Sequence, residues 1–291
     1  MSIKKWLEQN TSSLNGKVVA ITGSTGGLGK ELTKYISSLG ASIIFLDRNM
    51  ERSQKNKEDV VSLYPDADIK IIRTDLEDMS SVKKAVELLK NEGIDIFIHN
   101  AGAYSIPRHK TSVGYDNVFQ INFVSPYYMI KELIPYLKER NGKVVVVGSI
   151  AHNYSKTDEN DVDFSSRKKA SLVYGNAKRY LMFSLFRLFE NEEGVTLSVT
   201  HPGITFTNIT AHYPKLIFAI IKHPMKVIFM KPKKAALSIL KGLFDSCSNN
   251  EWIGPRVFDV WGYPRKHTLK TCKKEEADVI CKRADEIYSK L

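Results

Sequence analysis

The sequence contains few cysteines and no pair of them at metal-binding spacing. Its 291 residues include three cysteines, Cys247, Cys272 and Cys281, and no C-x-x-C motif. An odd number of cysteines without such a pair argues against a disulfide framework and against a structural zinc site. We therefore expect no bound metal and a reducing, cytoplasmic setting.

Long apolar runs are also missing. Met1–Lys17 lacks the hydrophobic core of a signal peptide. The longest apolar stretch, Leu216–Met230, is interrupted by Lys222, Pro224 and Lys226, whereas a membrane-spanning helix needs about 20 apolar residues. The lysines in this stretch would permit shallow contact with a membrane surface, but packing against protein is the simpler expectation.

No repeat, low-complexity tract or Pro/Gly-rich linker divides the chain, so we expect residues 1–291 to form one domain. The net charge of +11 permits attraction to nucleic acid or anionic lipid. Charge alone indicates little about function, and a lysine-rich solvated surface is the simpler explanation of it. We therefore expect no nucleic-acid partner.

Short β-branched runs alternate with helical segments from one end of the sequence to the other. The candidate strands are Val18–Thr22, Ile43–Leu46, Ile69–Arg73, Ile94–Ile98, Val144–Val147, Val195–Val199 and Trp252–Phe258. These runs are nearly continuous in apolar residues, as expected for strands covered on both faces. The alternation predicts an α/β fold, a Rossmann-type doubly wound parallel sheet of about seven strands flanked by helices. The expected helices include residues 28–39, 82–89, 170–190 and a C-terminal helix at about 273–289.

A glycine-rich turn joins the first predicted strand to the first of these helices. Glycines let the backbone turn tightly and approach a pyrophosphate, whose charge is stabilised at a helix N-terminus. The turn can be read as G-x-x-x-G-x-G through Gly27 or as G-x-x-G-x-x-G through Gly26. The residues expected to bind a dinucleotide here are Gly23, Ser24, Thr25, Gly27, Leu28 and Gly29.

Asp47 and Arg48 end the second predicted strand, about twenty residues after the glycines, where an acidic residue binds the adenosine ribose. The Asp47 carboxylate would repel a 2′-phosphate, which favours NAD(H). Arg48 could instead hold that phosphate in a charge-assisted pair. We favour NAD(H) over NADP(H) and keep both as alternatives.

Further motifs follow the later strands in order. They are Asp75-Leu76, Asn100-Ala101-Gly102, Ser149, Tyr174-Gly175-Asn176-Ala177-Lys178 and Pro202-Gly203 with Thr207. Together with the glycine turn, this series resembles the short-chain dehydrogenase/reductase family over about residues 14–207. The resemblance implies an NAD(P)(H)-dependent oxidoreductase acting on a carbonyl or alcohol. It places the adenine at Asp75-Leu76, the adenosine side at Asn100-Ala101-Gly102 and the nicotinamide at Pro202, Gly203 and Thr207.

A tyrosine and a lysine one helical turn apart would provide acid/base chemistry. Tyrosine titrates near 10 unless perturbed, which is too high for efficient proton transfer at neutral pH. The ammonium of Lys178 on the same helix face would favour the tyrosinate of Tyr174. The resemblance also implies that Lys178 holds the nicotinamide ribose and that Ser149 donates a hydrogen bond to the substrate oxygen.

Asn122 is the fourth residue that the resemblance assigns to catalysis. Pro126 follows four residues later and has no N–H, so the Asn122 carbonyl would lose its helical partner. In the family, this position is ascribed a water relay between the lysine and solvent. The alternative is that Pro126 merely kinks a core helix.

The stretch between Ser149 and Tyr174 is longer than is common in the family and, with Ala151-His152 and His201-Pro202-Gly203, resembles the retinol-dehydrogenase-like branch. We expect a cofactor-binding half at about 14–150 and a catalytic and substrate half at about 151–291. An apolar lid at about 207–232 suggests a lipophilic substrate. His152 and His201 are expected to be structural.

Two other functions remain as alternatives. A non-catalytic NAD(P) sensor would need no acid/base residues, and a sugar-nucleotide epimerase or dehydratase is suggested by the second glycine spacing. Such epimerases usually carry a larger C-terminal domain. The resemblance further implies a homodimer or homotetramer assembled through the helices that carry Asn122 and Tyr174.

Overall fold

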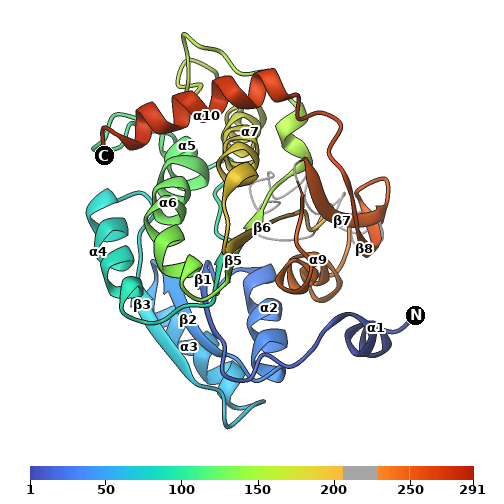
Figure 1. The fold of residues 1–291 in the computed structure, drawn as a ribbon. Helices are drawn as coiled ribbons and strands as arrows, with labels where there is room; N and C mark the ends of the chain where they lie inside the picture. The colour runs from blue at the N-terminus through green and yellow to red at the C-terminus, as the bar shows by residue number, and fades with distance from the viewer. Residues whose placement is uncertain (206–228, 249) are drawn as a thin grey trace, which may run out of the picture.

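A single eight-stranded sheet forms the centre of the molecule (Figure 1). The computed structural model describes residues 1–205, 229–248 and 250–291. The strand order is β3-β2-β1-β4-β5-β6-β7-β8. The strands are β1 (Val18–Thr22), β2 (Ser42–Asp47), β3 (Ile69–Arg73), β4 (Ile96–His99), β5 (Gly142–Val147), β6 (Val195–Thr200), β7 (Glu251–Val257) and β8 (Trp261–Thr268). Neighbouring strands run parallel except β7 and β8, which are antiparallel.

Two layers of helices cover the sheet, because its strands are apolar on both faces. In β5, Val144 and Val146 pack into one core, whereas Val145 and Val147 pack into the other. The first core is covered by α4 (Met79–Lys90), α6 (Ser125–Lys138) and α7 (Ala170–Leu188), and the second by α2 (Gly27–Ser38), α3 (Met50–Val61) and α9 (Pro232–Phe244).

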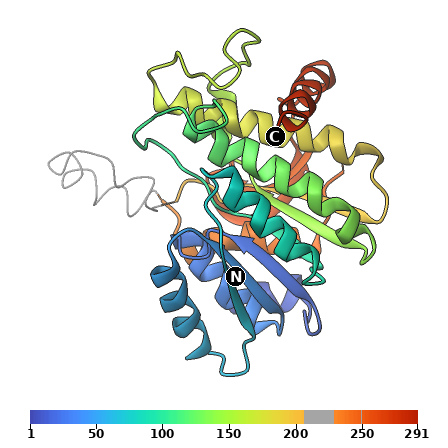
Figure 2. The same cartoon turned by 90° about the vertical axis from the view of Figure 1, so that its left-hand side faces the viewer.

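The two ends of the chain add a helix to each layer. At the N-terminus, α1 (Ile3–Asn10) lies beside α9 and buries Trp6 next to Tyr263 of β8. At the C-terminus, α10 (Lys274–Tyr288) packs along α7 as an outermost element of the fold (Figures 1 and 2).

The predicted doubly wound parallel sheet is confirmed, and α10 coincides with the predicted C-terminal helix. The eighth strand was missed. β8 is an edge strand that carries Pro264 and the exposed Arg265 and Lys266, and edge strands tolerate proline and charge because one side has no partner. Its sequence therefore lacks the apolar run on which the strand prediction depends. No helix in the described ranges is long and apolar enough to cross a membrane.

Asp95 links neighbouring segments at the edge of the sheet where the parallel strands begin. The residue is 4% exposed, and its carboxylate accepts hydrogen bonds from Val18 N (2.9 Å), Lys17 Nζ (3.0 Å) and Arg140 Nη2 (3.3 Å). Its main chain also pairs with β1 and β5, through Asp95 N to Val18 O and Lys143 N to Asp95 O, both 2.9 Å. Burial raises the pKa of Asp95, but the Val18 amide and the two cations outweigh it, and the net pKa is below the ordinary 3.8.

We predict that Asp95→Asn destabilises the protein at neutral pH. A lowered folded-state pKa means that the carboxylate stabilises the fold above its unfolded pKa of about 3.9 and that this stabilisation is lost as the pH falls through the folded value. In urea at pH 7, the free energy of unfolding of the variant should be lower than that of the wild type by about 1–3 kcal/mol. This difference should become smaller below about pH 4, where Asp95 of the wild type becomes protonated. The exposed Asp66→Asn serves as the control. An unchanged unfolding midpoint at pH 7 would contradict the prediction.

Candidate active site

The glycine turn after β1 is set by close backbone contacts. Gly23 has a φ of +72°, and a Cβ there would lie 2.9 Å from Ala101 Cα. A Cβ on Gly29 would lie 2.1 Å from Gly23 O, whereas one on Gly26 would meet no atom nearer than 3.7 Å. Both readings of the motif therefore share Gly23 and Gly29 as the positions that require glycine. The fold does not require it at Gly26.

The first turn of α2 is open to a ligand. The helix begins at Gly27, and its N-cap Gly26 provides no side-chain hydrogen bond to the first amides. Such amides and the helix dipole favour an anionic group. Asn100 fixes the turn from the neighbouring strand end, donating from Nδ2 to Gly23 O (2.9 Å) and Thr22 O (3.2 Å).

A cavity of 380 Å³ extends from this turn across the ends of β2 and β3. Of the predicted cofactor residues it is lined by Gly23, Thr25, Gly27, Leu28, Gly29, Asp47, Arg48, Asp75, Leu76, Asn100, Ala101 and Gly102. Asn49 and Arg52, which we did not predict, also line it. They follow Asp47 at the start of α3, and no motif distinguishes them in the sequence.

Ser24 does not line this cavity. Its side chain is fully buried and donates to Asp47 Oδ2 (2.5 Å), which also accepts from Ser53 Oγ (2.7 Å). The Ser24 hydroxyl therefore supports Asp47, and the expected contact between Ser24 and the cofactor stays a prediction. Arg48 is exposed and pairs with Glu77 (3.3 Å) and Asp75 (4.0 Å).

A second cavity of 440 Å³ adjoins the first and shares Leu28, Asn100 and Gly102 with it. Ser149, Tyr174 and Lys178 meet in its wall, as the sequence predicts, together with Pro202 and Gly203. Ser149 follows β5, and the other two lie one turn apart on α7. Thr207 and most of the expected lid at 207–232 lie outside the described residues.

Burial dominates the titration of the Tyr174/Lys178 pair. Lys178 is 2% exposed and donates from Nζ to Val147 O (2.9 Å). Burial lowers the pKa of Lys178 to about 7. It also raises the pKa of Tyr174 to about 12, although a hydrogen bond with Ser149 acts in the opposite direction. We expected Lys178 to lower the pKa of Tyr174, but in the protein without ligand this pKa is raised. The lysine nitrogen donates to the Val147 carbonyl, and its own lowered pKa reduces its positive charge.

Asn122 lies where the helix between β4 and β5 changes its winding. A short α5 (Asn117–Phe119) leads into a π-helical turn, η1 (Gln120–Val124), before α6 begins, and π-turns are frequent at functional sites. The Asn122 side chain donates from Nδ2 to Ala103 O and Val118 O, both at 2.8 Å. Its buried Oδ1 has no partner among the described groups. A Cβ on Gly102 would lie 2.8 Å from that oxygen and 3.6 Å from Lys178 Nζ, so Asn122 and Lys178 approach the same glycine.

These features fit a dinucleotide. The first cavity offers free helix amides and an acidic group at the end of β2, and the second places a hydroxyl, a phenol and an amine together. The buried side-chain amide oxygens of Asn100 and Asn122 lack partners among the described groups. Asn100 lines both cavities, and Asn122 lies behind Gly102, which also lines both.

Comparison with known proteins identifies the family. The model of short chain dehydrogenases matches residues 17–215. The chain is 30% identical over 226 residues to the chloroplastic short-chain dehydrogenase TIC 32 A of Brassica napus, covering 70% of this chain and 69% of that protein. It is 28% identical over 218 residues to retinol dehydrogenase 12 of Mus musculus, covering 72% and 69%.

Solved structures agree with the fold. An uncharacterized protein from Mycobacterium Paratuberculosis superimposes with a TM-score of 0.79 at 20% identity, over 97% of this chain and 96% of that one. Pseudomonas aeruginosa RhlG, solved with NADP, gives 0.61 at 23% identity over 80% and 93%. Fold and site define an NAD(P)-dependent oxidoreductase that acts on alcohol or carbonyl groups. The chain belongs to the short-chain dehydrogenase family.

We predict that Gly29→Ala and Gly26→Ala differ sharply. The added methyl at Gly29 meets the Gly23 carbonyl and should lower the free energy of unfolding by about 1–3 kcal/mol, with weaker binding of NADH. Gly26→Ala should leave the unfolding free energy unchanged, because its Cβ has space. Thermal melts and NADH fluorescence titrations of both variants provide the measurement. Equal melting temperatures for the two variants would show that the close contact is relieved without cost.

Proposed function

We propose that the chain transfers a hydride between NAD(H) and a lipophilic alcohol or carbonyl compound, with Tyr174 as general acid and base. The observation that carries the proposal is the second cavity, where Ser149, Tyr174 and Lys178 share one wall. Apolar and aromatic side chains form much of the remaining lining, namely Val147, Ile150, Ala151, Tyr104, Tyr154, Ile204 and Phe229. This composition suits a substrate with an apolar body and one polar reacting group.

Each polar side chain has a distinct task in this scheme. The dinucleotide, when bound, supplies or accepts the hydride. Tyr174 gives a proton to the substrate oxygen during reduction and takes it back during oxidation, and Ser149 holds that oxygen by a hydrogen bond. Lys178 would hold the ribose hydroxyls of the bound cofactor through Nζ, and such hydrogen bonds would favour the ammonium. That charge then favours the tyrosinate.

Asn122 has a fourth task in the proposal. Its position beside Gly102 and Lys178 supports a relay of protons from the lysine toward solvent through a bound water. The partnerless Oδ1 and the π-turn are compatible with this task.

Substitution of Tyr174 by Phe tests the proposal. The variant keeps the ring packing against Tyr104 (5.3 Å between centroids) and loses the proton donor, so turnover should fall by about 10²–10⁴-fold while NADH binding persists. Oxidation of NADH with a series of medium-chain aldehydes measures it, with the exposed Tyr136→Phe as control. Cofactor binding without any turnover in the wild type would favour the sensor. Cofactor retained through purification would favour the epimerase.

The surroundings of the adenosine cavity support NAD(H). Asp47 lies in the cavity wall, and its carboxylate is held by two serine hydroxyls from behind the wall. Asp75 and Glu77 add negative charge around Arg48. A 2′-phosphate would have to compete with these carboxylates for Arg48. Arg48 and Arg52 remain the groups that would hold such a phosphate, as the alternative requires.

Asp47→Ser should shift the preference toward NADPH. Removal of the carboxylate eliminates repulsion of the 2′-phosphate and one acceptor for the ribose diol, so the ratio of NADH to NADPH affinity should fall by at least about tenfold, equivalent to about 1.4 kcal/mol. Fluorescence titration with each cofactor measures the ratio. Arg48→Ala is the matched comparison and should leave NADH affinity unchanged. A wild type that prefers NADPH, with the preference lost in Arg48→Ala, would assign the choice to Arg48.

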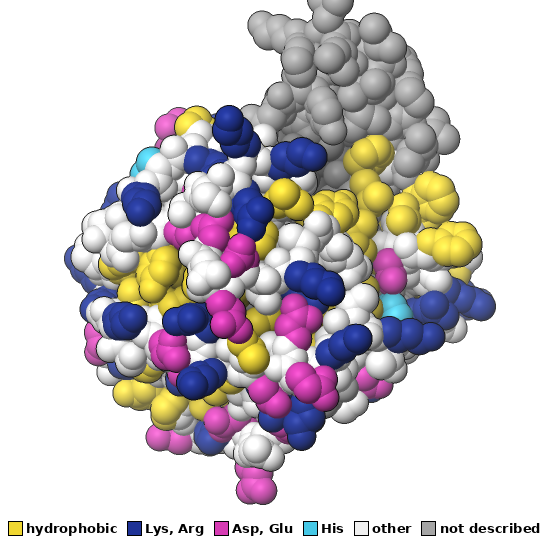
Figure 3. Space-filling model, turned by 90° about the horizontal axis from the view of Figure 1, so that it is seen from above, with side chains coloured by type: hydrophobic (Ala, Val, Ile, Leu, Met, Phe, Trp, Pro, Cys, Tyr) yellow, Lys and Arg dark blue, Asp and Glu magenta, His cyan; other side chains and the backbone are white. Residues whose placement is uncertain are grey.

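Assembly and location complete the proposal. The expected homodimer or homotetramer through α6 and α7 remains a prediction, and α10 already covers α7 on that side. We retain a cytoplasmic location and a retinol-dehydrogenase-like substrate class as proposals, supported by the three cysteines without disulfide partners and the similarity to retinol dehydrogenase 12. Figure 3 shows acidic side chains interspersed with the basic ones on the face seen from above, which supports a solvated surface rather than a nucleic-acid groove.

A further inference from the structure

His152 joins the catalytic loop to the C-terminal segment, residues 269–291. It belongs to η2 (Ile150–Asn153), the 3-10 turn that follows Ser149, and its side chain is fully buried. Nδ1 lies 2.6 Å from Ser149 O, and Nε2 lies 2.8 Å from Thr271 Oγ1. A carbonyl only accepts, so Nδ1 carries the proton and Nε2 accepts from the threonine hydroxyl. Burial lowers the pKa of His152, so the neutral ring persists at neutral pH with this tautomer.

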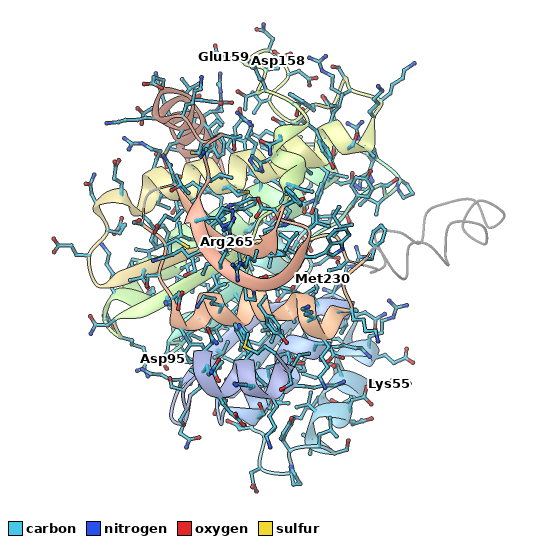
Figure 4. The ribbon with its side chains drawn as sticks, turned by 90° about the vertical axis from the view of Figure 1, so that its right-hand side faces the viewer. Lys55, Asp95, Asp158, Glu159, Met230 and Arg265 are labelled. Atoms are coloured by element: carbon cyan, nitrogen blue, oxygen red, sulfur yellow. The ribbon has the colours of Figure 1, made fainter. Side chains whose placement is uncertain are left out.

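A second connection runs parallel to the first. Arg179 of α7, 6% exposed, donates from Nη1 to His152 O (2.9 Å). Its Nε donates to Glu276 Oε1 of α10 (2.6 Å), and Nη2 pairs with the other oxygen of that carboxylate. A bidentate pair of this kind fixes orientation as well as distance. Thr271 therefore holds the ring of His152 directly, and Glu276 holds its carbonyl through Arg179. Figure 4 views the molecule from the side of the sheet edge at which Arg265 is labelled.

Close packing restricts the movement of His152 and the turn η2 that carries it. A Cβ on Gly175 would lie 2.4 Å from Ala151 O, so η2 rests directly on α7 one residue after Tyr174. On the other side, the His152 ring meets Trp252 edge-on at 5.7 Å, and Trp252 stacks on His201 at 5.1 Å. The turn that carries Ser149 is thus enclosed between α7 and the β7–β8 end of the sheet.

We propose that His152 is a positioning residue through which Thr271 and Glu276 orient Ser149 toward Tyr174. The inference rests on the proposed function. The family model ends at residue 215, so Thr271 and Glu276 lie outside the matched region. A part of the chain beyond that region then determines the geometry of the catalytic serine. Small displacements of a positioned catalytic group lower turnover strongly.

Thr271→Val tests the joint, because valine keeps the shape and removes the hydroxyl that bonds His152. We expect kcat for aldehyde reduction to fall between about tenfold and a hundredfold, with NADH affinity and melting temperature unchanged. Backbone amides of residues 150–153 should exchange with deuterium faster than in the wild type. Thr268→Val, at an exposed position on β8, is the matched control and should change neither kcat nor exchange. His152→Asn, which keeps a donor toward Ser149 O, should retain more turnover than His152→Ala.

A double substitution shows whether the effect passes through Ser149. In the Ser149→Ala background, Thr271→Val should cause no further loss of kcat, because coupled residues are not additive. An equal loss in both backgrounds, or unchanged exchange at 150–153, would overturn the inference. If Ser149→Ala alone left turnover unchanged, or the wild type reduced no aldehyde, the proposed function would fail instead. Deuterium exchange at residues 150–153 in the wild type and in Thr271→Val would still test the contact between Thr271 and His152.

Discussion

Close approach of two backbone segments at the carboxyl ends of β1 and β4 is the constraint on which the whole site depends. Gly23 and Ala101 are so near that any side chain at Gly23 would overlap the second segment. Asn100 and Thr22 join the same two segments by hydrogen bonds. Parallel strands bring these ends to one edge, where Asn100 and Gly102, on either side of Ala101, line both cavities.

The catalytic half is organised by burial rather than by charge attraction between its members. Lys178 is enclosed to the point where its pKa falls to about 7, and a buried amine of this kind is costly unless acceptors surround it. Val147 O provides one acceptor. In the proposed function, the remaining donors of Lys178 would meet the cofactor, whose binding would then favour the charged form of the amine. Coupling of charge to binding would restrict acid/base chemistry to the loaded enzyme.

Sequence patterns reveal the parts of this molecule that repeat a local rule. Strands buried on both faces are continuous apolar runs, and the glycine turn and the Tyr174/Lys178 spacing each follow from a local backbone requirement. β8 escapes such reasoning, since an edge strand with Pro264 and basic side chains has no apolar signature. The direction of the Ser24 side chain could not be predicted for a different reason. A hydroxyl inside a cofactor turn can face either the ligand or the protein, and here the buried Asp47 receives it.

His152 shows a third limit of sequence reasoning. The sequence predicts a structural role for this histidine beside Ser149, but its partner Thr271 is 119 residues away, and no spacing rule connects them. The bond becomes visible only when α10 and the loop before it are placed against α7. Because Arg179 directly follows Lys178 on that helix and reaches Glu276, the helix that carries Tyr174 and Lys178 also anchors the C-terminal segment. In the proposed function, the packing of α10 and the geometry of Ser149 are parts of one arrangement, so a change in the terminal helix would alter the position of the serine without touching the cofactor cavity.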